Sequence, residues 1–372
     1  MNNQIVYQIF VRNYSKEGSF LMVQKDLERI KDLGVDIVYF MPIHKIGIKN
    51  RKGTYGSPYA IKDYYSITPD YGTIEDFKSL VNKIHDLNMK IILDMVFNHT
   101  TPDNVLVDTH PEYYFYRDGK RGNRVGDWSD IVDLDHSRDD VQHYLLDVLK
   151  YWVNLGVDGF RFDVANLIPL SFFKMARKEL GKDVIFIAES IEKSFHDYLK
   201  TVGIIATKDE DLFPTFDSAY NYSWYHDLEA YLKKEKTLQK LVDALNEDET
   251  LLYQVGSRLN CFENHDLERI AHYLNNDNLK EIIRLFAYLK GNVFIYMGQE
   301  YGISHKPELF EKDPVIWTKN DEIYRAYKDA IMLKKKLNLS LLDKYYFDVE
   351  ENKLKLTIKR TNGEVLTELF NI

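Results

Sequence analysis

Short apolar runs alternate along the chain with amphipathic stretches of about ten to eighteen residues, the pattern of repeated βα units around a parallel sheet. In residues 73–88 the apolar positions keep helical spacing behind Thr73 and Asp76, which resemble a capping box, and a second helix is predicted at about 139–154. The apolar runs predict eight strands, at residues 4–11, 35–42, 90–96, 157–163, 184–189, 213–220, 256–262 and 292–297. Eight such units favour an α/β fold of the (β/α)8 TIM-barrel type over a doubly wound sheet.

Two segments depart from this alternation. Residues 98–137 hold glycines, acids and aromatics without steady periodicity, which predicts a short insertion domain after the third strand. Two alternating runs within residues 345–370 flank Thr361-Asn362-Gly363, and Asn-Gly between such runs predicts a hairpin. We therefore expect a catalytic barrel in residues 1–97 and 138–340, an insertion domain in 98–137 and a reduced C-terminal β region in 341–372.

Composition narrows the class of protein. Apolar residues make up 45% of the chain and charged residues 29%, as expected for a folded globular protein. The formal net charge of -9 argues against a nucleic-acid partner, which needs clustered basic residues. Cys261 is the only cysteine, so an intrachain disulfide and a cysteine-based zinc site are both excluded. The N-terminal residues do not resemble a signal peptide and no apolar stretch is long enough to span a membrane, so we expect a cytoplasmic protein.

Acidic residues gather where the predicted strands end. Asp94, Asp163 and Glu189 close three strands, and Asp266 lies just past the seventh. Each alone is better explained as a helix cap or as the partner of a nearby arginine. In a barrel, however, all strand ends meet at one mouth, where catalytic groups lie, and the basic residues Arg161, His99 and His265 lie at strand ends too.

Four motifs in this order resemble the signature regions of the α-amylase family (glycoside hydrolase family 13), and the chain resembles its short intracellular bacterial members. They are DMVFNHT (94–100), GFRFDVAN (159–166), IFIAES (185–190) and FENHD (262–266). The resemblance extends over about residues 4–340 through VYQIFVRNYS, GVDIVYFMPI, GSPYAIKDYY and IYMGQE, which are similar to the family's first, second and eighth strands and its tyrosine loop.

The resemblance implies a retaining hydrolysis of glycosidic bonds carried out by three carboxylates. Asp163 would be the nucleophile, Glu189 the general acid and then base, and Asp266 the carboxylate that holds sugar hydroxyls. Glycosidic cleavage needs such a pair of carboxyl groups flanking an oxocarbenium-like transition state. Arg161 lies two residues before Asp163 on the same strand face and is expected to lower its pKa, while burial and neighbouring anions are expected to raise that of Glu189.

Further contacts follow from the same resemblance. His99 and His265 would bind hydroxyls of the sugar being cleaved, Tyr59 would be the platform beneath its ring, and Asp94 would orient Arg161. The family often holds one calcium ion, for which Asn98 and Asp133 match the ligand positions and Leu167 would contribute its backbone carbonyl. The alternative is that Asn98 and Asp133 only hydrogen-bond across the insertion. No organic cofactor is expected.

Bond preference rests on smaller clues. The motif IVDLD (131–135) is nearer the pattern of α-1,4-acting members, and Ala60 replaces the aspartate that closes the cleft of many exo-acting glucosidases. Asn166 and Leu167 replace a Lys-His pair that many amylases use on the leaving-group side. The sequence therefore predicts α-1,4 cleavage in maltodextrins, starch or glycogen-type glucans. An oligo-α-1,6-glucosidase, a 4-α-glucanotransferase and a non-catalytic glucan-binding protein are the alternatives, and endo or exo action and oligomeric state stay open.

Overall fold

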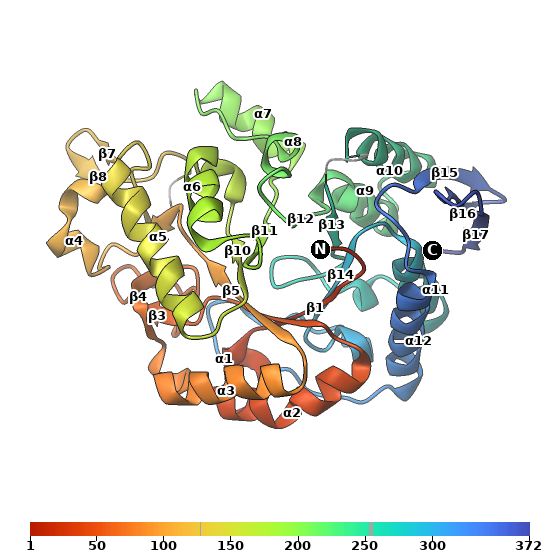
Figure 1. Ribbon diagram of the computed structural model, residues 1–372, viewed down its shortest axis with the longest axis horizontal. Coiled ribbons are helices and arrows are strands. Elements are labelled where there is room, and N and C mark those ends of the chain that lie inside the picture. Colours follow the sequence, from red (N-terminus) through yellow and green to blue (C-terminus); the bar gives the residue numbers. More distant parts are fainter. Residues whose placement is uncertain (127, 253–255) are drawn as a thin grey trace.

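A closed barrel of parallel strands forms the centre of the computed structural model, which describes residues 1–126, 128–252 and 256–372. Around the barrel the strands run in the order β1-β14-β13-β12-β11-β10-β5-β2 (Figure 1). Their bounds are β1 Ile5–Ile9, β2 Ile37–Phe40, β5 Lys90–Met95, β10 Gly159–Phe162, β11 Ile185–Ala188, β12 Ser218–Tyr220, β13 Arg258–Asn260 and β14 Asn292–Tyr296. The predicted (β/α)8 fold is confirmed.

All eight predicted strands are present, but the sixth begins later than predicted. Residues 209–212 form a short helix, α8 (Asp209–Leu212), immediately before the segment 213–220 predicted as a strand. The backbone N–H groups of Thr215 and Phe216 then donate to the carbonyl of Leu212, which keeps this segment coiled. An apolar run of this length does not distinguish a strand from a buried turn, so the pattern alone predicted too long a strand.

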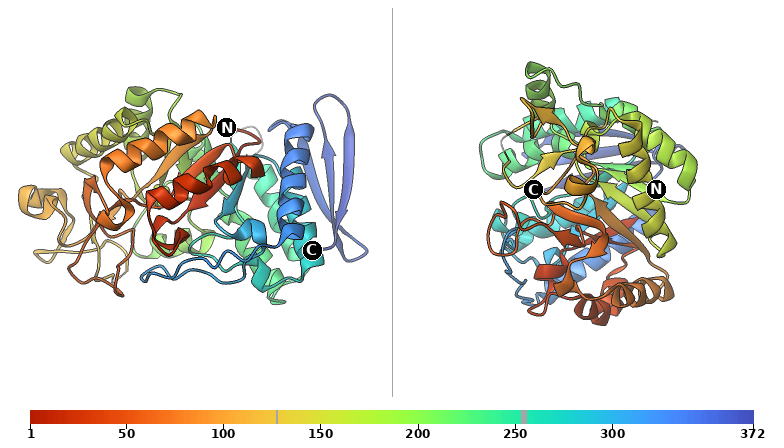
Figure 2. Two further views of the ribbon diagram at one scale, coloured as in Figure 1. Left: turned by 90° about the horizontal axis from the view of Figure 1, so that it is seen from below. Right: turned by 90° about the vertical axis from the view of Figure 1, so that its left-hand side faces the viewer.

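Helices surround the barrel and cover its strands (Figure 2). The predicted capping box is confirmed, because Thr73 accepts from the backbone of Asp76 and Asp76 accepts from that of Thr73. The longer helices are α2 Phe20–Leu33, α3 Ile74–Asp86, α5 Asp139–Asn154, α6 Leu170–Leu180, α7 Lys193–Thr201, α9 Tyr222–Leu232, α10 Leu238–Leu252, α11 Asn276–Tyr288 and α12 Asp321–Leu337. The short ones are α1 Val11–Tyr14, α4 Leu106–Thr109, η1 Pro69–Tyr71, η2 Pro111–Tyr113, η3 Ala165–Leu167, η4 Ile270–His272 and η5 Gln299–Tyr301. Within the described residues no helix has the length and apolar character needed to cross a membrane.

Two excursions from the barrel build one side of its mouth. After β2 the chain forms the antiparallel pair β3 (His44–Ile46) and β4 (Ile61–Ile67), whose connecting loop carries Tyr59. After β5 it forms β6 (His99–Thr100), the hairpin β7 (Tyr116–Arg117) and β8 (Lys120–Arg121), and β9 (Val132–Asp133). Strand β9 returns antiparallel to β6, with His99 paired to Asp133. The boundaries 98–137 for an insertion domain stay a prediction.

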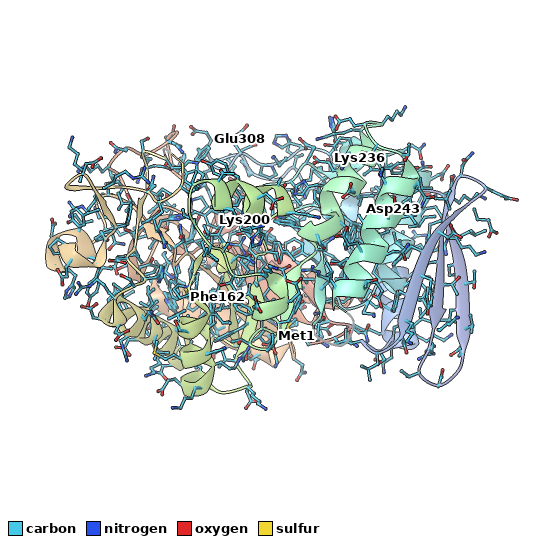
Figure 3. The ribbon with its side chains drawn as sticks, turned by 90° about the horizontal axis from the view of Figure 1, so that it is seen from above. Met1, Phe162, Lys200, Lys236, Asp243 and Glu308 are labelled. Atoms are coloured by element: carbon cyan, nitrogen blue, oxygen red, sulfur yellow. The ribbon has the colours of Figure 1, made fainter. Side chains whose placement is uncertain are left out.

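The C-terminal residues form a separate antiparallel sheet at the opposite end of the molecule from the β7–β8 hairpin (Figure 1). Its strands are β15 Lys344–Glu350, β16 Lys353–Lys359 and β17 Val365–Phe370, so the first predicted run is in fact two strands. Glu351 and Asn352 have φ angles of 51° and 59°, as a tight two-residue hairpin turn requires. The sheet packs beside α10 and α11, where Arg284 contacts Glu368 at 2.9 Å; Figure 3 shows it next to the helix that carries Asp243.

Candidate active site

The predicted acids meet at the C-terminal ends of the barrel strands. Asp94 lies in β5, Arg161 in β10, and Asp163 and Glu189 follow β10 and β11 directly. Arg161 and Asp94 are register partners on neighbouring strands, so their side chains leave the sheet on the same face. Asp163, Glu189 and Asp266 all line a single cavity of about 410 Å³. The fold thus brings together residues that are up to 172 positions apart in the sequence.

Arg161 is the fully buried centre of the cluster. Its Nη1 lies 2.7 Å from Asp94 Oδ1 and 3.1 Å from Asp163 Oδ1, and its Nη2 lies 2.6 Å from Glu189 Oε1. Tyr39 and Tyr59 both donate to Asp94 Oδ2, at 2.5 and 2.9 Å. Asp94 is therefore saturated with donors, and its role in orienting Arg161 stays a prediction, while the other two carboxyl groups face the cavity.

The pKa values of the two cavity carboxyl groups are both raised. Burial, followed by the charge of Glu189, raises the pKa of Asp163 well above its ordinary value. Burial also raises the pKa of Glu189, and Asp266 adds to the effect. The expectation that Arg161 lowers the pKa of Asp163 is therefore wrong in its net result, because one guanidinium shared by three carboxyl groups does not offset the burial. Two carboxyl groups that influence each other in this way titrate as a pair.

Glu189 is held by the backbone that follows Asp163. The N–H of Val164 donates to Glu189 Oε2 at 2.8 Å. Val164 has a φ of 38°, in the left-handed region that a β-branched residue rarely adopts. Strained backbone of this kind persists only where the surrounding structure fixes it, and it collects at functional sites. The strain here turns one N–H toward the carboxyl group of Glu189.

A second chain of hydrogen bonds joins Tyr59, His265 and Asp266. Tyr59 stacks on His265 with a centroid distance of 5.1 Å and contacts its Nε2 through Oη at 2.7 Å. The side-chain amide of Gln8 donates to His265 Nδ1 at 3.2 Å, which leaves the ring hydrogen on Nε2. Asp266 Oδ2 lies 2.9 Å from that nitrogen. Although burial acts to raise it, the pKa of Asp266 is lowered to about 2, because the contact with His265 outweighs the burial.

His99 also lines the cavity, and burial lowers its pKa to about 4. The ring is therefore neutral near pH 7, and its hydrogen resides on one of the two nitrogens. Asn98 Nδ2 lies 3.2 Å from His99 Nδ1. All four predicted sugar-contacting residues, Tyr59, His99, Arg161 and His265, thus belong to this site, and their contacts with sugar stay a prediction.

The expected calcium ligands contact a basic side chain instead. Arg124 Nη2 donates to Asn98 Oδ1 at 3.0 Å, and the backbone N–H of Arg124 donates to Asp133 Oδ2 at 2.7 Å. Among the described residues, no group of three or more His, Cys, Asp or Glu is arranged to hold a metal ion. The oxygens of Asn98 and Asp133 therefore do not fit the calcium site that the resemblance implies, and they match the alternative of hydrogen bonding across this region. Leu167 lines the catalytic cavity.

Loops add residues to the cavity that the sequence did not indicate. Lys52 Nζ lies 2.8 Å from Asp130 Oδ1, which joins the β3–β4 loop to the segment before β9. Phe310 lies beside Lys52, and Phe195 of α7 also lines the cavity. None of these residues follows a barrel strand directly, so strand-end reasoning could not find them. An exposed tryptophan, Trp128, was the one available signal in the irregular segment 98–137.

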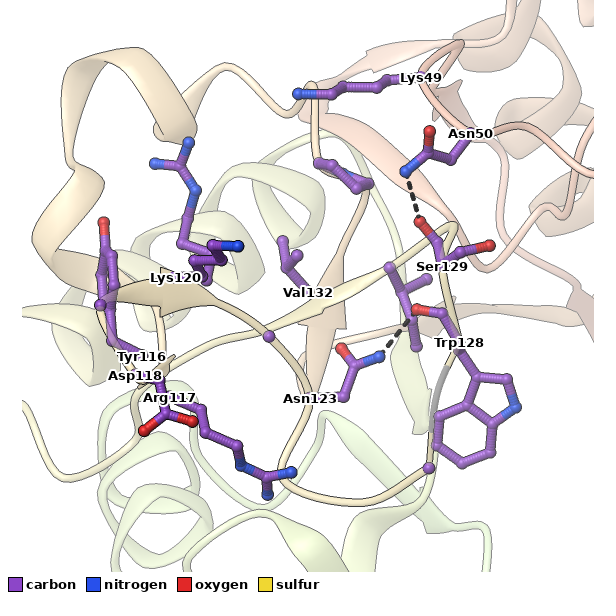
Figure 4. A pocket seen from close by; sticks show the side chains of 16 residues that line it. Lys49, Asn50, Tyr116, Arg117, Asp118, Lys120, Asn123, Trp128, Ser129 and Val132 are labelled. Atoms are coloured by element: carbon purple, nitrogen blue, oxygen red, sulfur yellow. Dashed lines mark hydrogen bonds between the residues drawn. The ribbon is translucent and has the colours of Figure 1, made fainter.

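A larger hollow of about 940 Å³ adjoins this cavity (Figure 4). Trp128 and Ile131 line both spaces. Asn50 and Asn123 donate to the backbone carbonyls of Ser129 and Trp128, both at 2.8 Å, and so hold the segment between the two spaces from either side. An extended ligand in the catalytic cavity would continue over Trp128 into this hollow.

A (β/α)8 barrel with carboxyl groups gathered on one buried arginine at its mouth defines a glycoside hydrolase of the barrel type. The family model described as "Alpha amylase, catalytic domain" matches residues 10–336. The chain belongs to the α-amylase family.

Relatives of known name agree with this placement. The solved α-amylase from Lactobacillus plantarum is 39% identical, with a TM-score of 0.92, and the match covers 99% of this chain and 88% of that one. A maltogenic α-amylase from Thermotoga neapolitana is 32% identical with a TM-score of 0.88, covering 99% and 86%. The probable oligo-1,6-glucosidase 3 of Bacillus subtilis is 25% identical over 84% of this chain and 68% of its own length.

Proposed function

We propose that this glycoside hydrolase cleaves α-1,4-glucosidic bonds of maltodextrins and related glucans with retention at the anomeric carbon. The observation that carries the proposal is the contact of Asp163 and Glu189 with the same guanidinium, that of Arg161, at 3.1 and 2.6 Å. Two carboxyl groups brought this close suit the retaining mechanism, in which one attacks carbon directly, better than the inverting one, which needs room for a water molecule between them.

In the proposed mechanism Glu189 gives its proton to the glycosidic oxygen while Asp163 attacks the anomeric carbon. The bond from that carbon to the leaving oxygen breaks, and a glycosyl ester of Asp163 forms. Glu189, now ionised, removes a proton from a water molecule that attacks the same carbon and releases Asp163. Two inversions give net retention, and both carboxyl groups return to their starting state.

The other polar side chains hold the sugar in this proposal. Tyr59 lies beneath the ring, and His99, His265 and Asp266 bind its hydroxyls. The leaving group lies on the side of the cavity where Glu189 and Phe195 are, because the acid must reach the glycosidic oxygen. The remaining part of the chain then points toward Tyr59, where Lys52, Asp130 and Phe310 line the cavity.

The preference for α-1,4 bonds is supported by the relatives. Two solved structures that the chain resembles, at 39% and 32% identity, are named α-amylase and maltogenic α-amylase. A second candidate, oligo-1,6-glucosidase activity, is supported by the name of the Bacillus subtilis relative at lower identity. Another Bacillus subtilis relative is named intracellular maltogenic amylase, which supports a cytoplasmic location for this enzyme as well.

The product profile tests the proposal. The enzyme is incubated with maltoheptaose and, separately, with isomaltose, and products are followed by chromatography and by the anomeric proton signals. We expect short α-configured maltooligosaccharides from maltoheptaose and little cleavage of isomaltose. Cleavage of isomaltose alone would reverse the bond assignment, and β-configured first products would rule out retention. The variant Asp163→Asn controls for contaminating activity, because it retains the fold but lacks the nucleophile.

A further inference from the structure

Arg124 lies between the two side chains that match the family's calcium ligands. It precedes β9, whereas Asn98 follows β5, so their contact ties this segment to the barrel. Nη2 of Arg124 lies 3.0 Å from Asn98 Oδ1, and Nε lies 3.4 Å from Asp133 Oδ2, which also accepts the backbone N–H of Arg124. Asn98 and Asp133 are both buried.

The chemistry of arginine fixes which way the Asn98 amide faces. A guanidinium has donors only, so the atom of Asn98 that meets Arg124 must be the oxygen. The NH₂ group therefore points the other way, toward His99 Nδ1 at 3.2 Å. Because an amide NH₂ only donates, Nδ1 must accept, and the ring hydrogen of neutral His99 is then on Nε2.

We propose that Arg124 is a positioning residue that fixes His99, through Asn98, in the tautomer with hydrogen on Nε2, and that its guanidinium takes the place of a calcium ion. The first part rests on the proposed function, in which His99, a residue of the catalytic cavity wall, binds a sugar hydroxyl. With the hydrogen on Nε2, His99 meets that hydroxyl as a donor.

Charge and ligand number support the second part. Among the described residues Asp133 is the carboxylate that pairs with Arg124, and one guanidinium neutralises one carboxylate. A calcium ion takes six to eight oxygen ligands and two positive charges. A calcium ion that bound here would have to displace the positively charged guanidinium of Arg124 from Asn98 Oδ1 and Asp133 Oδ2. Arg124 already links Asn98 and Asp133 through hydrogen bonds, and it needs no further oxygen ligands to do so.

The variant Asn98→Asp separates positioning from folding. A carboxylate still accepts from Arg124, now as an ion pair, so the variant should fold, with a somewhat lower melting temperature in EDTA because one guanidinium then faces two buried carboxylates. It cannot donate to His99, however, and it draws the ring hydrogen to Nδ1. We expect kcat/KM on maltoheptaose to fall about tenfold through loss of one hydrogen bond to the sugar, and the ¹⁵N signals of His99 to report the exchanged tautomer.

Asn82→Asp is the control for the added charge, since Asn82 is exposed on α3 and lines neither the catalytic cavity nor the adjoining hollow. Wild-type kcat/KM in Asn98→Asp, or ¹⁵N signals that place the hydrogen on Nδ1 in the unaltered protein, would overturn the positioning role. These signals do not depend on catalysis, so they test the tautomer even if the enzyme cleaves no α-glucan, in which case only the proposed function fails.

Metal analysis tests the replacement of calcium. We expect the wild-type melting temperature to be the same in EDTA and in millimolar calcium, and dialysis against calcium to leave the protein without stoichiometric metal. A lower melting temperature in EDTA, or one bound calcium ion per chain, would refute this part. Arg124→Gln should lower the melting temperature, and this loss should shrink in the Asp133→Asn background, where no buried carboxylate needs a partner. Additive losses would show that Arg124 does not neutralise Asp133.

Discussion

Arg161 Nη2 lies 2.6 Å from Glu189 Oε1, while Nη1 of the same guanidinium lies 3.1 Å from Asp163 Oδ1. One planar cation thus holds both carboxyl groups that flank the scissile bond in the proposed mechanism. Arginine offers two separate donor nitrogens in a fixed plane, which lysine cannot do. The spacing of the two carboxyl groups therefore depends on a side chain that takes no part in bond breaking.

Substitution of this residue tests that dependence. We expect Arg161→Lys to lower kcat about a hundredfold or more, because a single ammonium cannot contact Asp94, Asp163 and Glu189 together. The melting temperature should fall as well, because the buried carboxylates lose part of the positive charge that compensates them. Arg177→Lys, at a partly buried ion pair outside the cavity, is the control for general effects of the exchange. A kcat within about fivefold of the wild type would contradict the role of the guanidinium.

The pH profile should respond to Asp266. Its negative charge raises the pKa of Glu189, after the larger effect of burial. Asp266→Asn removes that charge, so the pKa of Glu189 falls and the proton needed by the leaving group is lost at lower pH. We expect the alkaline limb of kcat/KM against pH to move toward acid, in addition to a lower maximum. If the limb stays in place, Asp266 does not act on Glu189 electrostatically.

Lys334 of α12 should make stability depend on pH. It is buried, donates to the carbonyl of Leu289 at 2.7 Å, and burial lowers its pKa to about 7. Because its pKa is near 10.5 in the unfolded chain, the unfolded state binds the extra proton between pH 7 and 10.5, and this destabilises the fold increasingly as pH falls through that range. At or below pH 7 the cost is on the order of a few kcal/mol.

We therefore expect Lys334→Met to raise the free energy of unfolding at pH 7, and the gain to shrink as pH rises toward 10. Denaturant unfolding of both proteins across this range measures the difference. Lys335→Met is the neighbouring control, because Lys335 is exposed and pairs with Asp36. If Lys334→Met raises the free energy of unfolding by the same amount at every pH, then protonation of Lys334 does not destabilise the folded state.

The pair of Lys52 and Asp130 should limit product length. Its 2.8 Å contact forms part of the wall of the catalytic cavity, and in the proposed mechanism the glucan continues along this part of the wall. We expect Lys52→Ala to shift the products of maltoheptaose toward longer fragments, and the exchange Lys52→Asp with Asp130→Lys to restore the wild-type pattern. Lys90→Ala is the control, since Lys90 is exposed at the start of β5, at the opposite end of that strand from Asp94. Unchanged product lengths in Lys52→Ala would mean that the pair does not bound the site.

The sequence by itself determined the barrel and its acids. The βα alternation predicted each strand from local hydrophobic patterning, and the acids were found because a residue such as Asp163 follows its strand directly. Glu189 was found in the same way. In a barrel of parallel strands the C-terminal strand ends converge independently of the loop conformations. The position of each acid along the chain was therefore enough to predict its position in space.

Tertiary structure decided what lies opposite those acids. Lys52 meets Asp130, and Arg124 meets Asn98, across loops whose paths follow from packing rather than from any period in the sequence. Tertiary structure also decided the net pKa shifts. The effect of burial on the pKa of Asp163 outweighs that of the neighbouring Arg161, and burial exists only in the folded chain. Local pattern sets which residues stand at the barrel mouth, whereas long-range contacts set their charges, their tautomers and the extent of the cavity they enclose.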